Sequence, residues 1–233
     1  MPGLRRPFRG GRSGGILVGM PRHLSVIARR GGAAGVLAAM LAAPLVAQAP
    51  QPLAPDLQIR LAVQAAPPSL RDSATVQGYD AQGTFVTLRR GTNRLICMAP
   101  DPKAEHLEVS CHDRDLEPFF ARGRALAAQG VTGERRVRQR WAEITAHRLP
   151  MPTGKMNTIM TGTGFDSTTG QIHDAYTRWV IYVPNATVAS TGLGEAPTAP
   201  GAPWLMFAGT PGAHIMITPP RPTPPPAAAP THQ

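Results

Sequence analysis

The sequence predicts an α+β domain in which an antiparallel sheet packs against a pair of helices. Residues 74–111 alternate short β-rich runs with turn formers, and residues 115–150 then change to the 3.6-residue period of helices. Strand character returns after Pro150 and continues to residue 218. The hydrophobic content of 42% is enough for a core, and the charged fraction of 16% is low for a soluble domain. This composition argues against a coiled coil or a charged helix bundle.

The first part of the domain is predicted to form four short strands. They are rich in Val, Ile, Thr and aromatic residues, which favour strands, and segments with turn formers separate them. Because the strands follow one another closely, we expect them to form an antiparallel meander. The four expected strands are residues 74–79, 84–89, 94–98 and 107–111.

The two cysteines, Cys97 and Cys111, lie on the last two of these strands. If the strands pair about residue 104, positions whose numbers sum to 208 face each other, as these two do. Directly opposed Cβ atoms are close enough for a disulfide, which would close a loop of about 15 residues. A catalytic thiol or a metal pair is the alternative, but the spacing matches neither C-x-x-C nor a zinc pattern.

The middle of the chain is predicted to form an antiparallel pair of helices. Asp115 and Pro118 suit a helix start, and Gly130 suits a helix end. Thr132 can cap a second helix, which Pro150 ends, and the short connection places the two side by side. The expected inward residues are Phe119, Phe120, Gly123, Leu126 and Ala127 on the first helix, and Val137, Trp141 and Ile144 on the second.

Later strands complete the predicted sheet, and the flanking segments are of other kinds. Residues 176–183 are mostly apolar, which indicates a central strand. The other late strands are expected at residues 156–161, 204–207 and 214–217. We therefore expect a signal or targeting segment (1–49), a Pro-rich leader with a short helix at 56–64 (50–72), a single domain (73–218) and a disordered, Pro-rich tail (219–233).

Most of the positive charge lies near the N-terminus. Residues 1–49 hold seven of the 24 basic residues and no acidic one, and the rest of the chain has 17 basic and 14 acidic residues, a net charge of +3. A basic stretch followed by the Ala-rich run 31–49 is typical of a signal peptide, with cleavage after Ala47 or Ala49. The start is Met1 or Met20. We expect a periplasmic or extracellular protein with no transmembrane span after cleavage, in a compartment that favours a disulfide.

The order and spacing of several residues resemble those in a group of exported bacterial proteins of unassigned function. It begins with Gly91-Thr92-Asn93, continues through Cys97, Cys111 and Asp113, and ends with a helix pair and a strand that closes on Tyr182-x-Pro184. The resemblance covers about residues 75–218. It implies an exported α+β domain and no particular activity.

Two His-Asp pairs, His112-Asp113 and His173-Asp174, are the candidates for catalysis. Histidine beside carboxylate makes general bases and metal sites, and His106, Asp115 and Asp166 are further possible members. Neighbouring residues on a strand point to opposite faces, however, and no nucleotide, hydrolase or metal motif is present. We therefore expect no cofactor and no metal.

One dense basic run lies on the second predicted helix, at Arg135, Arg136, Arg138 and Arg140. We expect a solvated face opposite the apolar stripe, partly neutralised by a Glu134–Arg138 pair. The alternative is an anion-binding surface for phosphate or the anionic envelope. No aromatic residues interleave the arginines, and the charge outside residues 1–49 is nearly balanced, so nucleic acid is not an expected partner.

The sequence thus favours an exported protein that binds a partner or small ligand, or belongs to the envelope, without catalysis. The sequence does not decide whether the protein is an enzyme, and it favours a protein without catalytic activity. The alternatives are a hydrolase or metal-dependent enzyme that uses the two His-Asp pairs, and anion binding by the arginine-rich helix.

Overall fold

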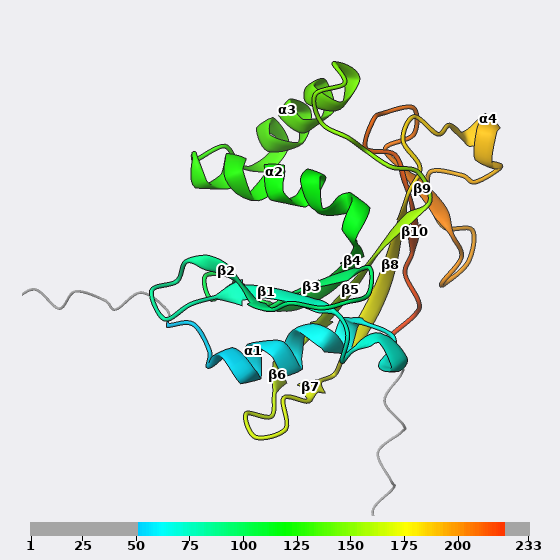
Figure 1. The fold of residues 1–233 in the computed structure, drawn as a ribbon. Helices are drawn as coiled ribbons and strands as arrows, with labels where there is room; N and C mark the ends of the chain where they lie inside the picture. Colours follow the sequence, from blue (N-terminus) through cyan, green and yellow to red (C-terminus); the bar gives the residue numbers. More distant parts are fainter. Residues whose placement is uncertain (1–50, 222–233) are drawn as a thin grey trace, which may run out of the picture. The chain divides into compact units, whose positions relative to one another are not determined.

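A computed structural model describes residues 51–221; the predicted signal segment and the tail beyond Arg221 lie outside these residues. Its main sheet has eight strands, and helices lie on both faces (Figure 1), which confirms the α+β class. In spatial order the strands are β2 (Phe85–Arg89), β1 (Thr75–Tyr79), β3 (Leu95–Met98), β4 (Leu107–Asp113), β5 (Lys155–Gly162), β8 (Tyr176–Tyr182), β10 (His214–Ile217) and β9 (Trp204–Met206). The α-helices are α1 (Pro55–Ala62), α2 (Glu117–Ala128), α3 (Gly133–Thr145) and α4 (Val188–Thr191), and β6 (Gly164–Phe165) pairs with β7 (Ile172–His173).

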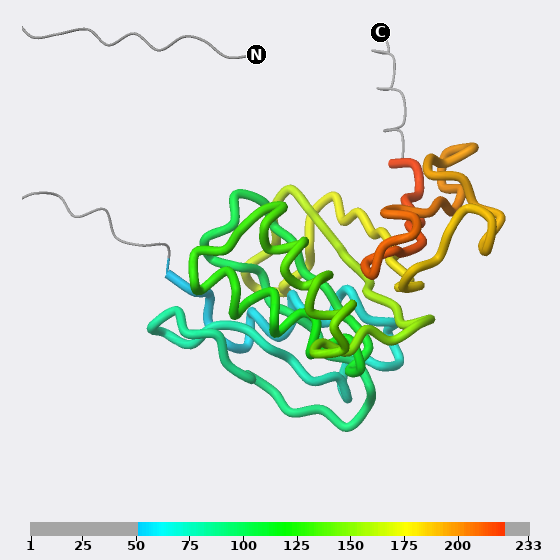
Figure 2. Tube along the Cα trace, turned by 90° about the horizontal axis from the view of Figure 1, so that it is seen from above, coloured from blue at the N-terminus to red at the C-terminus, as the bar shows by residue number. Residues whose placement is uncertain are grey.

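Helix α1 covers one face of the sheet, and α2 and α3 lie over the opposite face (Figures 1 and 2). Leu57, Leu61 and Ala62 of α1 are buried in one core with Val76 of β1 and Cys97 of β3. The short helix expected in the leader is therefore present, and it contributes core residues that precede residue 73.

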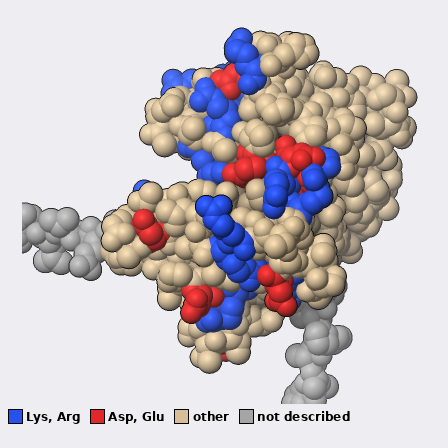
Figure 3. Space-filling view, in the orientation of Figure 1, with Lys and Arg blue, Asp and Glu red and all other residues tan. Residues whose placement is uncertain are grey.

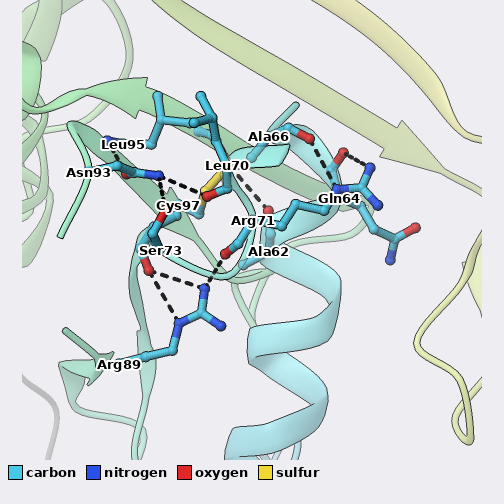
Figure 4. The surroundings of a disulfide bond; sticks show 12 residues. Ala62, Gln64, Ala66, Leu70, Arg71, Ser73, Arg89, Asn93, Leu95 and Cys97 are labelled. Carbon is cyan, nitrogen blue, oxygen red and sulfur yellow. Dashed lines mark hydrogen bonds between the residues drawn. A yellow bond between two sulfur atoms is a disulfide. The ribbon is translucent and has the colours of Figure 1, made fainter. Parts of the chain in front are cut away.

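One strand pairing differs from the expected meander. Strands β1–β2 and β3–β4 pair antiparallel as expected, but β3 lies beside β1, in parallel. After β2 the chain crosses the start of β1 at Gly91, where a Cβ atom would collide with the backbone of Ser73–Thr75. The amides of Thr92 and Asn93 donate to the Ser73 carbonyl, and the Asn93 side chain donates to the Leu70 carbonyl (Figure 4). These hydrogen bonds hold the crossing segment against the start of β1. A meander contains no such crossing.

The predicted disulfide joins Cys97 and Cys111, whose Cα atoms are 4.0 Å apart. The two residues are direct partners in the β3–β4 register, as are Leu95 and Asp113. The bond lies on the α1 face, where Cys111 Sγ is 3.4 Å from the Ala62 carbonyl oxygen. The expected register is confirmed.

The predicted helix pair is confirmed, with α2 and α3 joined by a short connection that contains Gly130 at φ +74°. A 3-10 turn (Arg114–Leu116) precedes α2, and the Asp113 carboxylate accepts a hydrogen bond from the Asp115 amide there. Arg122 of α2 makes two hydrogen bonds, of 2.7 and 2.5 Å, to the Glu143 carboxylate of α3. This bidentate pair fixes the two helices against each other.

The C-terminal strands continue the sheet, and β8 is an interior strand between β5 and β10, as expected. The start of the predicted tail lies against β8, where the Tyr176 hydroxyl donates to the Pro219 carbonyl at 2.6 Å. The Arg221 guanidinium lies 4.3 Å from the Tyr176 ring centroid. Among residues 51–221, none of the helices has the length and apolar character that a membrane crossing requires.

Candidate functional site

A cavity of about 310 Å³ lies among α2, α3 and the chain around the β8–β10 pair. It is lined by aromatic rings, guanidinium groups and a few small or apolar residues. The rings belong to Phe119, Phe120, Trp141, Tyr182, Phe207 and His214, the guanidinium groups to Arg124, Arg136 and Arg140, and the rest of the lining to Met98, Gly123, Val137 and Gly212.

Helix α3 divides the basic run between solvent and the cavity. Arg136 and Arg140 line the cavity, four residues apart, beside Val137 and Trp141, which have the same spacing. Arg135 and Arg138 are exposed, and Arg138 makes the expected ion pair with Glu134. Figure 3 shows Lys and Arg side chains over the helix pair, and further ones, next to Asp and Glu, over the rest of this face.

Arg136 and Arg140 have no counterion among the described residues. Both are half-buried, neither pairs with a described carboxylate, and the Nε of each is buried without a hydrogen-bond partner there. Burial lowers the pKa of Arg140 below its usual value, and the charge of Arg136 lowers it further. The Arg140 guanidinium lies 4.1 Å from the Phe119 ring centroid. Two like charges held near each other and partly shielded from water favour an anion at this place.

Arg124, the third cavity arginine, is already neutralised. It pairs with Glu117, whose other oxygen lies 2.8 Å from Nε2 of His112. Burial alone raises the pKa of Glu117, but the hydrogen bonds from His112 and Arg124 outweigh burial and hold it below its usual value. Phe120 lines the cavity, whereas His112, its stacking partner with ring centroids 4.4 Å apart, is fully buried. The His112–Glu117–Arg124 chain therefore supports the cavity wall.

Tyr182 and His214 are neutral polar groups in the cavity. Burial raises the pKa of Tyr182 to about 12, although the nearby Arg140 charge opposes this rise. Burial lowers the pKa of His214, whose Nδ1 lies 2.8 Å from the Gly212 carbonyl oxygen. Since a carbonyl only accepts, Nδ1 carries the proton and Nε2 of the neutral ring is an acceptor.

Phe207 closes one side of the cavity in an uncommon backbone conformation. Its φ is +58°, in the left-handed region, and its ring packs edge-on against Trp141 at 5.3 Å and His214 at 5.6 Å. The segment is fixed by neighbouring hydrogen bonds, such as that from the Asn185 amide to the Thr210 carbonyl at 2.8 Å. Such strain is typical of sites whose geometry is held in place before a ligand binds.

The four His-Asp candidates are not brought together. His112 faces α2, whereas Asp113 forms ion pairs with Arg94 and Lys155 at the strand end. His112 is paired with Asn157 on β5, and the backbone of His173 lies beside Gly162, about 17 Å further along that strand at 3.3 Å per residue.

The remaining candidates have local partners or are exposed. Asp174 accepts a hydrogen bond from the Thr163 hydroxyl, Asp115 pairs with Lys155, and Asp166 accepts from turn amides. His106 is exposed. Within residues 51–221, no three His, Cys, Asp or Glu side chains are grouped as a metal site requires.

No sequence pattern indicated that aromatic residues from distant segments line this cavity. Trp141 was expected only as a core residue, and Tyr182, Phe207 and His214 only as parts of strands. One local signal was available, since Arg136 and Arg140 repeat with the same spacing as Val137 and Trp141 on the adjacent helix row.

Comparisons of this chain with protein-family models, with curated proteins and with solved structures find no match.

Proposed function

We propose that the protein is an exported, non-catalytic binding protein whose cavity takes a small anionic ligand. The observation that carries this proposal is the pair of half-buried guanidinium groups, Arg136 and Arg140, without a counterion among the described residues. An anion beside the two guanidinium groups would neutralise their charge and remove the repulsion between them. Export is supported by the signal-like residues 1–49 and, more weakly, by the disulfide.

Binding is favoured over catalysis by the groups that line the cavity. The lining has no carboxylate, thiol, lysine or aliphatic hydroxyl, and the phenol of Tyr182 has a pKa of about 12. The strong nucleophiles of the common hydrolases are therefore not among the lining side chains, and burial disfavours the ionised form of Tyr182. The separation of the two His-Asp pairs gives the enzyme alternative no support.

The test uses anilinonaphthalene sulfonate, an aromatic anion whose fluorescence rises on transfer to an apolar site. We expect saturable binding to the folded protein. Arg136→Gln with Arg140→Gln should weaken this binding about tenfold or more, because charged hydrogen bonds are lost. The matched control, Arg135→Gln with Arg138→Gln, removes the same charge from the exposed side of α3 and should leave affinity unchanged. Equal losses in the two double variants would contradict the proposal.

Thermal unfolding separates loss of the site from loss of the fold. Removing Arg136 and Arg140 relieves a repulsion, so the melting temperature should stay within about 4 °C of wild type, the shift that about 1 kcal/mol produces in a domain of this size. A variant that lost both the probe and its cooperative transition would be replaced by the single variant Arg136→Gln.

A further inference from the structure

We infer that the ligand is a compact aromatic oxyanion, a single aryl group that carries one carboxylate or phosphate. This inference rests on the proposed function and makes it more specific. Three properties of the cavity support it: its charge, its volume and the chemistry of its walls.

The charged side of the cavity is suited to an oxyanion head group. Arg136 and Arg140 both come from α3, and guanidinium N–H groups match carboxylate and phosphate oxygens. Tyr182 also lines the cavity, and it lies close enough to Arg140 for that positive charge to lower its pKa against the effect of burial. A neutral phenol is a third donor for the same head group.

The volume limits the size of the ligand. About 310 Å³ corresponds to the liquid volume of about ten water molecules, at roughly 30 Å³ each. A body of roughly a dozen non-hydrogen atoms fills such a space, which is at the small end of known ligand sites. A nucleotide or a long acyl chain would extend beyond this volume into solvent, so most of its surface would have no contact with the walls.

The walls favour a ring over an aliphatic body. Trp141 and Phe207 meet edge to face, with Phe119, Phe120 and His214 completing the aromatic wall, whereas Val137 is the one branched aliphatic side chain in the lining. Aromatic rings gain from edge-on and offset contacts with a further ring. At Gly212 a Cβ atom would collide with the Trp141 indole, so the glycine lets Trp141 lie flat against this segment.

The experiment compares ligands of equal size by isothermal titration calorimetry with the full mature protein. 3-Phenylpropanoate should bind about three- to tenfold more tightly than 3-cyclohexylpropanoate, which has the same side chain and the same number of non-hydrogen atoms but a saturated ring. 3-Phenylpropanamide, with no charge, should bind at least about tenfold more weakly than 3-phenylpropanoate. Phenyl phosphate is the parallel probe for a phosphate head, and the tighter of 3-phenylpropanoate and phenyl phosphate identifies the head group.

A variant of the wall tests the ring preference separately from the charge. Phe207→Leu should reduce the preference for 3-phenylpropanoate over 3-cyclohexylpropanoate to about twofold or less, while both acids still need Arg136 and Arg140. Failure of both 3-phenylpropanoate and phenyl phosphate to bind, or equal binding of 3-cyclohexylpropanoate to wild type, overturns this inference. The proposed function is contradicted by a separate result, namely that replacing Arg136 and Arg140 leaves the affinity for the sulfonate probe unchanged.

Discussion

The two faces of the main sheet differ in how completely their buried polar groups are satisfied. Under α1, the side chain of Gln58 is buried, and its nitrogen and oxygen are all used in bonds to Leu53 and Tyr79. Under α2 and α3, buried polar atoms lack a partner among residues 51–221. These atoms are Gln77 Oε1, His112 Nδ1, Asn157 Oδ1 and the Nε atoms of Arg136 and Arg140.

This difference sets a well-satisfied face of the sheet apart from the face that carries the proposed binding site. The α1 face contains the disulfide and a closely packed apolar core, which hold the strands in register. The α2–α3 face has buried polar atoms with no partner among residues 51–221 and a left-handed backbone at Phe207, features that cost stability where water does not compensate them. Proteins retain such costs mainly at functional sites, so the comparison points to the cavity side as the side under functional constraint.

The largest effect should come from removing the disulfide on the α1 face. Cys97→Ala with Cys111→Ala should lower the free energy of unfolding by about 3 kcal/mol, because a closed loop of about 15 residues no longer restricts the unfolded chain. Urea unfolding measures the change, and reducing agent should have no further effect on this variant. If affinity for the sulfonate probe fell together with stability, the two faces would not be independent.

A matched pair of amide substitutions tests the comparison directly. Gln58→Met leaves two carbonyls and the Tyr79 amide without their partner and should cost about 1–3 kcal/mol. Asn157→Leu removes an oxygen that has no described partner, so its cost should be below about 1 kcal/mol, or stability should rise. Denaturant midpoints of the two variants decide the matter. Equal costs would mean that Asn157 is as well satisfied as Gln58.

The smallest expected effect is a pH dependence that arises at His214. Burial lowers its pKa in the folded state, so the unfolded chain binds a proton more readily. The stability is therefore complete above the ordinary histidine pKa of about 6.5 and falls as the pH drops below it. His214→Gln should flatten melting temperature between about pH 6.5 and 5, whereas the control His106→Gln, at an exposed position, should keep the wild-type slope. If the melting temperature of His214→Gln still fell with pH as steeply as that of the wild type, the pH dependence would arise from other titratable groups.

Local features of the fold could be predicted well from the sequence. The pairing of Cys97 with Cys111 follows from two adjacent strands and the loop between them. The helix pair follows from the period around Val137 and Trp141 and from the stop at Gly130. The parallel β1–β3 pairing did not follow, because it depends on where Gly91 crosses the chain, and a turn signal alone does not say which strand comes next in the sheet.

The candidate site could be predicted only in part. The arginine run was an expected anion-binding alternative, and the spacing of Arg136 and Arg140 beside Val137 and Trp141 distinguishes them from Arg135 and Arg138. That this side of α3 borders a cavity beside the β8–β10 region is set by packing, which the sequence does not show.

The sequence alone determined the α+β class, the disulfide, the helix pair and the uneven distribution of positive charge. Each of these depends on composition or on residues close together in the chain, where period, turn chemistry and spacing act directly. Only the tertiary structure decided that Tyr182, Phe207 and His214 meet Arg136 and Arg140 around one cavity. These residues come from segments that lie far apart in the chain. They are brought into contact because their apolar surfaces are buried together, and no local sequence pattern records that burial.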